Sequence, residues 1–326
     1  MSTAAFGLSL EVDPGIEIPG IPCADDLGVC TPDASAYGHL AAHPPPQSPT
    51  RVRLDPQELA RRWRRASTSE VAHQQSSGEA PVSIEFAPPA GYLLWARGMG
   101  RILIALNGTE LLCDPEPGNS DWAALIPAQA LPLAATLRGF EVLHAAGVVV
   151  RGNAVLFAGP SGAGKSSLAA ALLHRGAALL SDDAVALELR GGTLIAHPGA
   201  DLLYLRRDEH DRLSTRERAG LGRSSTFLGK HRFGPSVSAL PAPLGGLFLM
   251  EYSEEGAPIE HIETVDPFAL LACTFSLSAQ APDRLARHLD IAVALAATEC
   301  IYRVRVRPDM DATQLADVLH EHLLGP

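Results

Sequence analysis

The chain has 326 residues, of which 46% are hydrophobic and 19% are charged, and its formal net charge is −11 at pH 7. This composition is that of a globular protein long enough for one large domain or two smaller ones. The negative charge argues against a nucleic-acid or anionic-membrane partner. The sequence contains no apolar run of roughly 20 residues and no basic, apolar leader, so neither a membrane span nor a secretory signal is expected. The five cysteines are scattered without metal-ligand spacing, and we expect buried free thiols in a reducing cytoplasm.

Short strands separated by turn residues are predicted over residues 1–118. One or two strands are expected within residues 5–19, and four more at Val82–Ala87, Tyr92–Ala96, Arg101–Leu106 and Glu110–Cys113. Residues 34–80 are rich in Pro, Ser, Gln and Arg, which is typical of an exposed and partly mobile segment. A short helix is expected there over 56–66. We therefore predict a small antiparallel β-unit as the first domain.

The second domain, residues 119–326, begins with a helix that Ser120 is expected to cap and that runs to Leu137. Two hairpins follow, because turn residues separate paired apolar runs. They join 142–150 to 154–158 and 184–189 to 193–197, and a short buried strand at Ala177–Leu180 lies between them. The predicted fold class is α/β, with a mixed sheet that contains hairpins and is flanked by helices.

Residues 205–240 are charged and lack periodicity, so we expect a lid or substrate loop there. The remaining elements are predicted from their hydrophobic patterns. Strands are expected at 245–250, 259–264 and 301–306, and helices at 266–276, 281–297 and 311–324.

A complete phosphate-loop (P-loop) motif, G-x-x-x-x-G-K-S, lies between the apolar run Ala154–Ala158 and a helix predicted over 165–175. Backbone N–H groups thus converge at the positive end of a helix dipole, where Lys165 can reach the β- and γ-phosphates and Ser166 can hold Mg²⁺. The alternative, a glycine-rich turn without a ligand, explains neither the Lys-Ser pair nor the flanking elements. The predicted nucleotide-binding residues are Gly159, Pro160, Ser161, Gly162, Ala163, Gly164, Lys165, Ser166 and Ser167.

Two neighbouring carboxylates, Asp182 and Asp183, follow the strand predicted after this helix. In a P-loop fold that strand is expected beside the strand that enters the loop, with its carboxyl end facing the γ-phosphate. Phosphoryl transfer needs one acidic group near Mg²⁺ and one that orients or deprotonates the attacking hydroxyl. The alternative for the pair is a turn that caps neighbouring backbone. His144, taken alone, fits a packed core histidine.

The stretch from His144 to Asp183 resembles the catalytic core of HPr kinase/phosphorylase. It carries a His before the P-loop, the pair Arg175-Gly176 after the following helix, and then the two aspartates, at matching spacings. A weaker likeness to smaller HPr-kinase-like proteins extends over most of the chain and includes the opening Phe6-Gly-Leu segment. Some of those relatives, including lasso-peptide kinases, are associated with ribosomal peptide biosynthesis.

The resemblance implies an HPr-kinase-type P-loop core that binds ATP and Mg²⁺. It implies Asp183 as the base that accepts the proton of the acceptor hydroxyl, and His144 and Lys165 as further catalytic residues. It also implies Ser166 and Asp182 as the residues at the metal. ATP rather than GTP follows from the resemblance, and the sequence carries no N-K-x-D-like guanine-recognition motif.

The sequence departs from the bifunctional enzymes after residue 197. Their Glu-Ile-Arg-Gly-x-Gly signature is absent, so neither HPr as substrate nor reverse phosphorolysis is implied. Asp208 or Glu209 are the candidates for a second metal ligand. Lys230 and Arg232 either close over the transferring phosphate or are ordinary loop charges.

The expected function is a Mg-ATP-dependent kinase that phosphorylates a hydroxyl, in the first place a serine, of a peptide, small protein or small metabolite. The alternative is a nucleotide-dependent interaction module that uses slow hydrolysis as a switch. A deep pocket would favour a metabolite, and an open groove a peptide. Nucleic-acid and membrane partners are not expected, and a homo-oligomer remains open.

Overall fold

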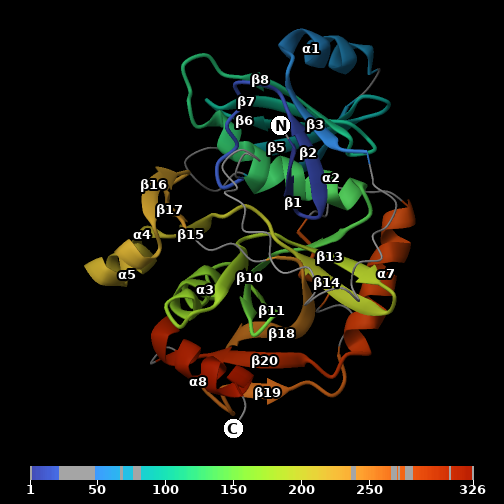
Figure 1. The fold of residues 1–326 in the computed structure, drawn as a ribbon. Helices are drawn as coiled ribbons and strands as arrows, with labels where there is room; N and C mark the ends of the chain where they lie inside the picture. Colours follow the sequence, from blue (N-terminus) through green and yellow to red (C-terminus); the bar gives the residue numbers. More distant parts are fainter. Residues whose placement is uncertain are drawn as a thin grey trace.

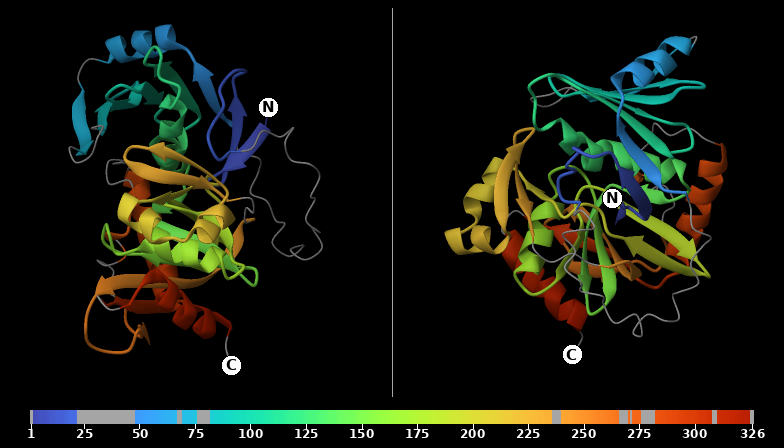
Figure 2. Two further views of the ribbon diagram at one scale, coloured as in Figure 1. Left: turned by 90° about the vertical axis from the view of Figure 1, so that its left-hand side faces the viewer. Right: turned by 45° about the horizontal axis from the view of Figure 1, so that its top comes forward.

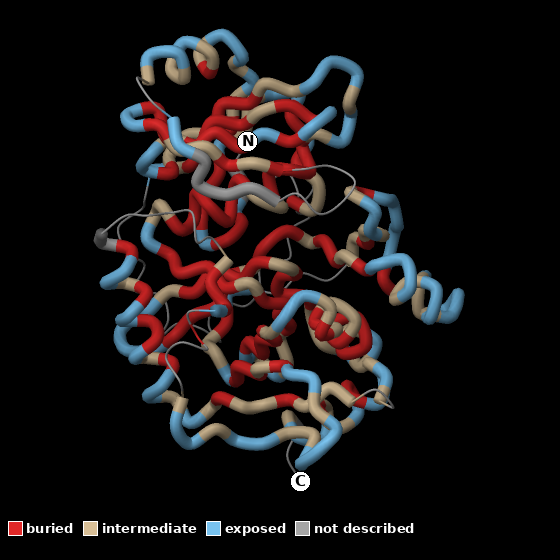
Figure 3. The backbone as a smooth tube through the Cα atoms, turned by 180° about the vertical axis from the view of Figure 1, so that it is seen from behind, coloured by how far each residue is buried: buried red, intermediate tan, exposed pale blue. Residues whose placement is uncertain are grey.

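The computed structural model describes residues 2–21, 48–66, 69–75, 82–235, 240–265, 270, 272–275, 282–307 and 310–324. Two large sheets lie one above the other in Figure 1, and a three-stranded sheet stands beside them. Buried backbone runs through both large sheets in Figure 3, and one hydrophobic core cluster contains residues of both. The fold is therefore mixed α/β, as the sequence predicts.

The upper sheet has eight strands in the order β1-β2-β3-β8-β7-β6-β5-β4. These strands are β1 (Ser2–Ala5), β2 (Leu8–Val12), β3 (Thr50–Leu54), β4 (Glu70–Gln75), β5 (Val82–Ala87), β6 (Gly91–Ala96), β7 (Gly100–Ile104) and β8 (Glu110–Pro115). The strands predicted between residues 82 and 113 are confirmed. The expectation of a wholly antiparallel unit is wrong, because β3 pairs in parallel with both β2 and β8. A long connection, not a hairpin, precedes β3, and parallel neighbours require such a connection.

Helices cover both faces of this sheet. α1 (Pro56–Arg65) buries Leu59 against Leu93 and Leu103 on one face. The other face, which carries Leu94, is covered by a helical run made of η2 (Trp122–Ala124), η3 (Ile126–Ala130) and α2 (Leu131–Leu137). The predicted helix over 120–137 is thus present as three consecutive helical types. Ser120 does not cap it, since Asp121 precedes the first helical residue and makes no side-chain cap.

The segment predicted as partly mobile, 34–80, contains β3, α1 and β4 in its described parts. Residues 34–47, 67–68 and 76–80 lie outside the described residues.

The lower sheet has nine strands, with the path β12-β10-β11-β18-β14-β13-β9; off this path, β20 pairs with β18 and β19 pairs with β20. They are β9 (Glu141–Leu143), β10 (Ala145–Val150), β11 (Asn153–Ala158), β12 (Ala178–Ser181), β13 (Val185–Arg190), β14 (Thr193–His197), β18 (Ala242–Tyr252), β19 (Ile259–His261) and β20 (Ile301–Val306). Both predicted hairpins, β10–β11 and β13–β14, are confirmed. β18 is long enough to pair with β14 near its start and with β11 and β20 further along.

The expectation that the strand before the two aspartates lies beside the strand that enters the loop is wrong. β10 lies between β12 and β11 and is antiparallel to both. Two antiparallel steps restore the direction, so β12 and β11 point the same way and their carboxyl ends reach the same edge of the sheet. The loop and the aspartates therefore still meet.

Three helices cover the lower sheet. α3 (Lys165–Leu173) and α8 (Ala312–Leu324) pack with Val155 and Phe157, and α7 (Pro282–Ala296) packs with Leu156. Because side chains alternate along β11, these residues identify opposite faces of the sheet. The predicted helix at 266–276 falls mostly outside the described residues, and its residue Thr274 forms a β-bridge with Leu143. No helix in the described part of the chain is long and apolar enough to cross a bilayer.

Residues 205–240, expected to be a loop, include ordered elements. β15 (Leu203–Leu205), β16 (Arg223–Phe227) and β17 (Lys230–Gly234) form the third sheet, and α4 (Arg207–Arg212) and α5 (Thr215–Gly220) connect its first two strands. Figure 2 shows this unit at the level between the two large sheets. Its strand β16 is largely exposed, so it lacks the apolar alternation that would identify it in the sequence.

Candidate active site

The glycine-rich loop, residues 159–164, joins β11 to α3 at the carboxyl edge of the lower sheet. Gly159 has φ +153, and a Cβ there would lie 2.5 Å from the carbonyl oxygen of Met250 on β18. Gly164 precedes α3 in a left-handed conformation and provides no side-chain cap. The first N–H groups of α3 are thus left without a capping side chain, and a helix start of this kind favours anions.

Lys165 folds back over the loop. Its Nζ donates to the carbonyl oxygens of Gly159 at 2.9 Å and Pro160 at 3.2 Å. Desolvation lowers the pKa of its ammonium group, while the charges of Asp183 and Asp182 oppose that shift. The loop carbonyl oxygens accept the N–H groups of Lys165 that phosphate oxygens could accept instead.

Asp182 connects three elements at the end of β12. Its Oδ1 accepts from Ser166 Oγ at 2.8 Å, and its Oδ2 accepts from the backbone N–H of Tyr204 at 2.8 Å. Burial raises the pKa of this carboxyl group to about 6, although the two hydrogen bonds and the charge of Lys230 lower it. Asp182 is therefore a buried carboxylate whose charge lacks full compensation.

Ser166 and Asp182 fit the requirements of a magnesium ion. A hydroxyl and an under-compensated carboxylate stand 2.8 Å apart at the start of α3. Among the described residues, no group of three or more His, Cys, Asp or Glu side chains could hold a metal ion. Mg²⁺ commonly takes one or two protein oxygens and completes its shell with phosphate and water.

Asp183 has φ +72, the left-handed region that is strained for a residue with a Cβ. His144 contacts it twice: its Nδ1 lies 3.0 Å from the Asp183 carbonyl oxygen and 3.5 Å from Oδ1. A carbonyl oxygen accepts only, so Nδ1 carries the proton in this contact. Desolvation, together with the charges of Lys165 and Lys230, lowers the pKa of His144. His144 is thus a neutral donor that supports the Asp183 turn.

The segment that precedes α7 also supports His144. The backbone N–H of His144 donates to the carbonyl oxygen of Cys273 at 2.6 Å. Cys273 and Cys113 are buried free thiols, as the sequence predicts, and Cys300 is half-buried. Cys23 and Cys30 lie outside the described residues.

The third sheet brings two cations to the site. Lys230 at the start of β17 interacts electrostatically with His144, Lys165 and Asp182. Arg206, which follows β15, would have its Nη1 3.5 Å from a Cβ built on Gly162. In the sequence, Lys230 is either a loop charge or a phosphate contact, and Arg206 belongs to a cluster of arginines between residues 206 and 223 that is either a solvated face or a phosphate cradle.

Tyr252 at the end of β18 is a further residue that the sequence does not indicate. Its Oη donates to the Gly162 carbonyl oxygen at 2.6 Å and so restrains the crown of the loop. Its neighbours in sequence carry no motif, so only the pairing of β18 with β11 places it there.

The remaining site residues predicted from the sequence differ in burial and in the groups that they contact. Ser161 is exposed, Ala163 is buried, and the buried Ser167 Oγ lacks a hydrogen-bond partner among the described residues. Glu209 accepts from the backbone N–H of Arg206 at 2.8 Å, and Asp208 lies 3.7 Å from the same arginine. Both acids thus interact with Arg206 at the start of α4, and no contact among the described residues links them to Ser166. Arg232 donates to Ser225 and stacks over Phe227.

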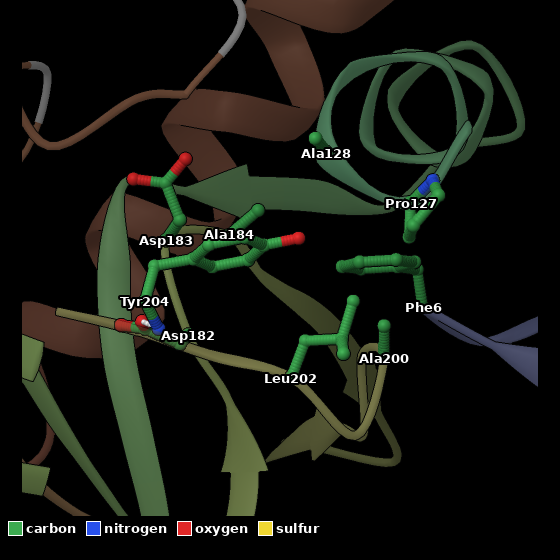
Figure 4. Close-up of a pocket in the computed structure, with 9 residues that line it drawn as sticks. All are labelled: Phe6, Pro127, Ala128, Asp182, Asp183, Ala184, Ala200, Leu202 and Tyr204. Atoms are coloured by element: carbon green, nitrogen blue, oxygen red, sulfur yellow. Dashed lines mark hydrogen bonds between the residues drawn. The ribbon is translucent and has the colours of Figure 1, made fainter. Parts of the chain in front are cut away.

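A pocket adjoins the two aspartates (Figure 4). It has a volume of about 290 Å³, part of which is open to solvent. Its walls come from the turn between β1 and β2, from η3, from the turn between β12 and β13, and from the segment that leads from β14 into β15. The lining residues are Phe6, Pro127, Ala128, Asp182, Asp183, Ala184, Ala200, Leu202 and Tyr204.

Comparisons with known proteins identify little. No protein-family model matches the chain, and no curated protein matches it. Among solved structures, the Hpr(Ser) kinase/phosphatase from Coxiella burnetii matches with 15% sequence identity over 56% of this chain and 97% of that chain, with a TM-score of 0.31. Similarity at this level supports no statement about activity, so the site geometry must carry the functional conclusion.

Proposed function

We propose that this protein is a Mg-ATP-dependent phosphotransferase that transfers the γ-phosphoryl group to a hydroxyl. The observation that carries the proposal is the hydrogen bond of 2.8 Å between Ser166, at the start of α3, and Asp182, at the end of β12. It joins an anion-binding helix start to a pair of carboxylates. Nucleotide-dependent phosphoryl transfer needs both parts in one place.

The nucleotide would lie along the glycine-rich loop. Its phosphates would accept from the first N–H groups of α3 and from Lys165 Nζ, which would exchange its present carbonyl partners for phosphate oxygens. Ser166 and Asp182 would hold Mg²⁺, which when bound neutralises charge on the β- and γ-phosphate oxygens. Lys230 and Arg206 are placed to contribute further positive charge as the phosphoryl group moves.

Asp183 would accept the proton of the acceptor. In the transfer step, a bond forms between the acceptor oxygen and the γ-phosphorus, and the bond from that phosphorus to the bridging oxygen of ADP breaks. The hydroxyl proton passes to the Asp183 carboxylate and from there to solvent, leaving ADP and a phosphomonoester. His144 would position Asp183 through the contact between its Nδ1 and the Asp183 carbonyl oxygen, 3.0 Å long.

The assignment of Asp183 is tested by Asp183→Asn, with Asp290→Asn on the exposed side of α7 as the matched control. We expect Asp183→Asn to bind Mg-ATP as the wild type does and to lose at least 100-fold in turnover, on the order of the contribution of a general base. Binding is measured by calorimetry and turnover by ADP release. Transfer by Asp183→Asn at a rate near that of the control would contradict the assignment.

A further inference from the structure

The pocket beside Asp183 contains a polar atom without a partner. The Tyr204 hydroxyl oxygen is buried and has no hydrogen-bond partner among the described residues. In Figure 4 this hydroxyl points away from the two aspartates, toward Phe6 and Pro127. A phenol keeps its proton at neutral pH, so this hydroxyl can donate as well as accept. A buried hydroxyl without a partner lowers the stability of the fold, because it has lost its hydrogen bonds to water. A ligand in the pocket could supply the missing hydrogen bond.

Tyr204 also belongs to the proposed metal site, because its backbone N–H donates to Asp182. One residue thus links the pocket to the carboxylate that would face Mg²⁺. A molecule in the pocket would lie next to Asp183, the residue that would accept the proton of the acceptor.

The N-terminal segment closes the far end of the pocket. Phe6 is buried in a left-handed conformation with φ +54, and its backbone N–H donates to the Pro198 carbonyl oxygen at 2.7 Å. Gly7 follows with φ +78, and a Cβ there would lie 2.4 Å from the Phe140 ring. This turn is therefore fixed to the segment that leads to Tyr204. The Phe6-Gly7 pair, noted in the sequence only for a family resemblance, becomes a wall of the site.

The lining determines which chemistry the pocket can accept. Apart from the two aspartates, its described walls are apolar side chains and the Tyr204 ring, and no Lys, Arg or His is among them. A carboxylate or phosphate placed here would lose water, gain no cation and face like charge.

We propose that this pocket binds the acceptor, and that the acceptor is an uncharged alcohol whose compact apolar body carries a second uncharged polar group that shares a hydrogen bond with Tyr204. The proposal rests on the phosphotransferase function above. The apolar body packs against Phe6 and Leu202, and the hydroxyl to be phosphorylated lies toward Asp183. The alcohol is either a free small molecule or the side chain of a peptide.

The test uses 2-methylpropane-1,3-diol as the probe, since it carries one hydroxyl for Asp183 and one for Tyr204, and 3-hydroxy-2-methylpropanoate, its matched acid, as the comparison. Saturation-transfer NMR measures both with the full-length protein, Mg²⁺ and a non-hydrolysable ATP analogue. We expect the alcohol to bind at least tenfold more tightly than the acid. Tyr204→Phe should weaken binding of the alcohol about fivefold, the effect of one hydrogen bond. Ala128→Phe, which fills the pocket, should abolish binding of the alcohol. Tyr302→Phe, remote from the pocket, should leave binding unchanged.

Two results would overturn the proposal: equal binding of acid and alcohol, or absence of alcohol binding while the ATP analogue binds. Failure of the analogue itself to bind to the wild type would instead contradict the phosphotransferase function. Tyr204→Phe removes an unpartnered buried hydroxyl, so it should melt at the wild-type temperature or above it. N-acetyl-threonine methylamide in the same titration separates the two sources, since tighter binding than the alcohol indicates a peptide side chain and weaker binding a free small molecule.

Discussion

Replacing Asp182 by asparagine should change how stability depends on pH. Burial raises the pKa of this carboxyl group from 3.8 to about 6 in the folded protein. Because the folded-state pKa lies above the unfolded value, the folded protein binds the proton more tightly, and stability falls as pH rises from about 4 to above 6. At about 1.4 kcal/mol per pKa unit, the whole effect is ~3 kcal/mol, of which roughly 1.4 kcal/mol falls between pH 5 and pH 8.

Asp182→Asn should keep the local bonds without the charge, since the new amide oxygen can accept from the Tyr204 N–H and the new amide NH₂ can donate to Ser166. Urea unfolding at pH 5, 6, 7 and 8, without metal or nucleotide, measures the difference between variant and wild type. We expect the variant to gain ~1.4 kcal/mol in unfolding free energy relative to the wild type over this range. Parallel pH dependences for the two proteins would refute the reasoning.

Two further substitutions address the loop. Gly159→Ala should cost ~1–3 kcal/mol in unfolding free energy, because the new Cβ meets the Met250 carbonyl oxygen at 2.5 Å in a backbone conformation unfavourable to side chains; wild-type stability in urea would contradict this. Lys165→Ala should weaken binding of the ATP analogue roughly 10- to 100-fold, the worth of a charge-assisted hydrogen bond. The free energy of unfolding should change little, because the free energy lost in desolvating the ammonium group offsets its hydrogen bonds to the loop. Calorimetric affinities that match the wild type would place the phosphates elsewhere.

Much of the lower sheet could be predicted because its strands are apolar runs bounded by turn residues. Arg151 and Gly152 both adopt positive φ, as a two-residue hairpin between twisted strands requires. The loop and the aspartates were recognisable from residue type and spacing alone. The position of β10 between β12 and β11 was not, since hydrophobicity reports burial and not which strands are neighbours.

The walls of the site were harder to predict for a different reason. Tyr204 contributes a backbone N–H to Asp182, and every non-proline residue has that group. Phe6 reaches the pocket from the other end of the chain, and Tyr252 reaches Gly162 through the pairing of parallel strands. Long-range contacts of this kind leave no local pattern. The third sheet was missed because its exposed strand carries Ser and Thr where buried strands carry Val and Ile.

If the loop and the two aspartates together transfer phosphate to an alcohol, phosphorus NMR of the wild type with Mg-ATP and 2-methylpropane-1,3-diol should show a new phosphomonoester signal that grows with ADP. The signal should be absent from Asp183→Asn measured beside it. Free phosphate as the sole product, at equal rates in both proteins, would contradict phosphoryl transfer to the alcohol.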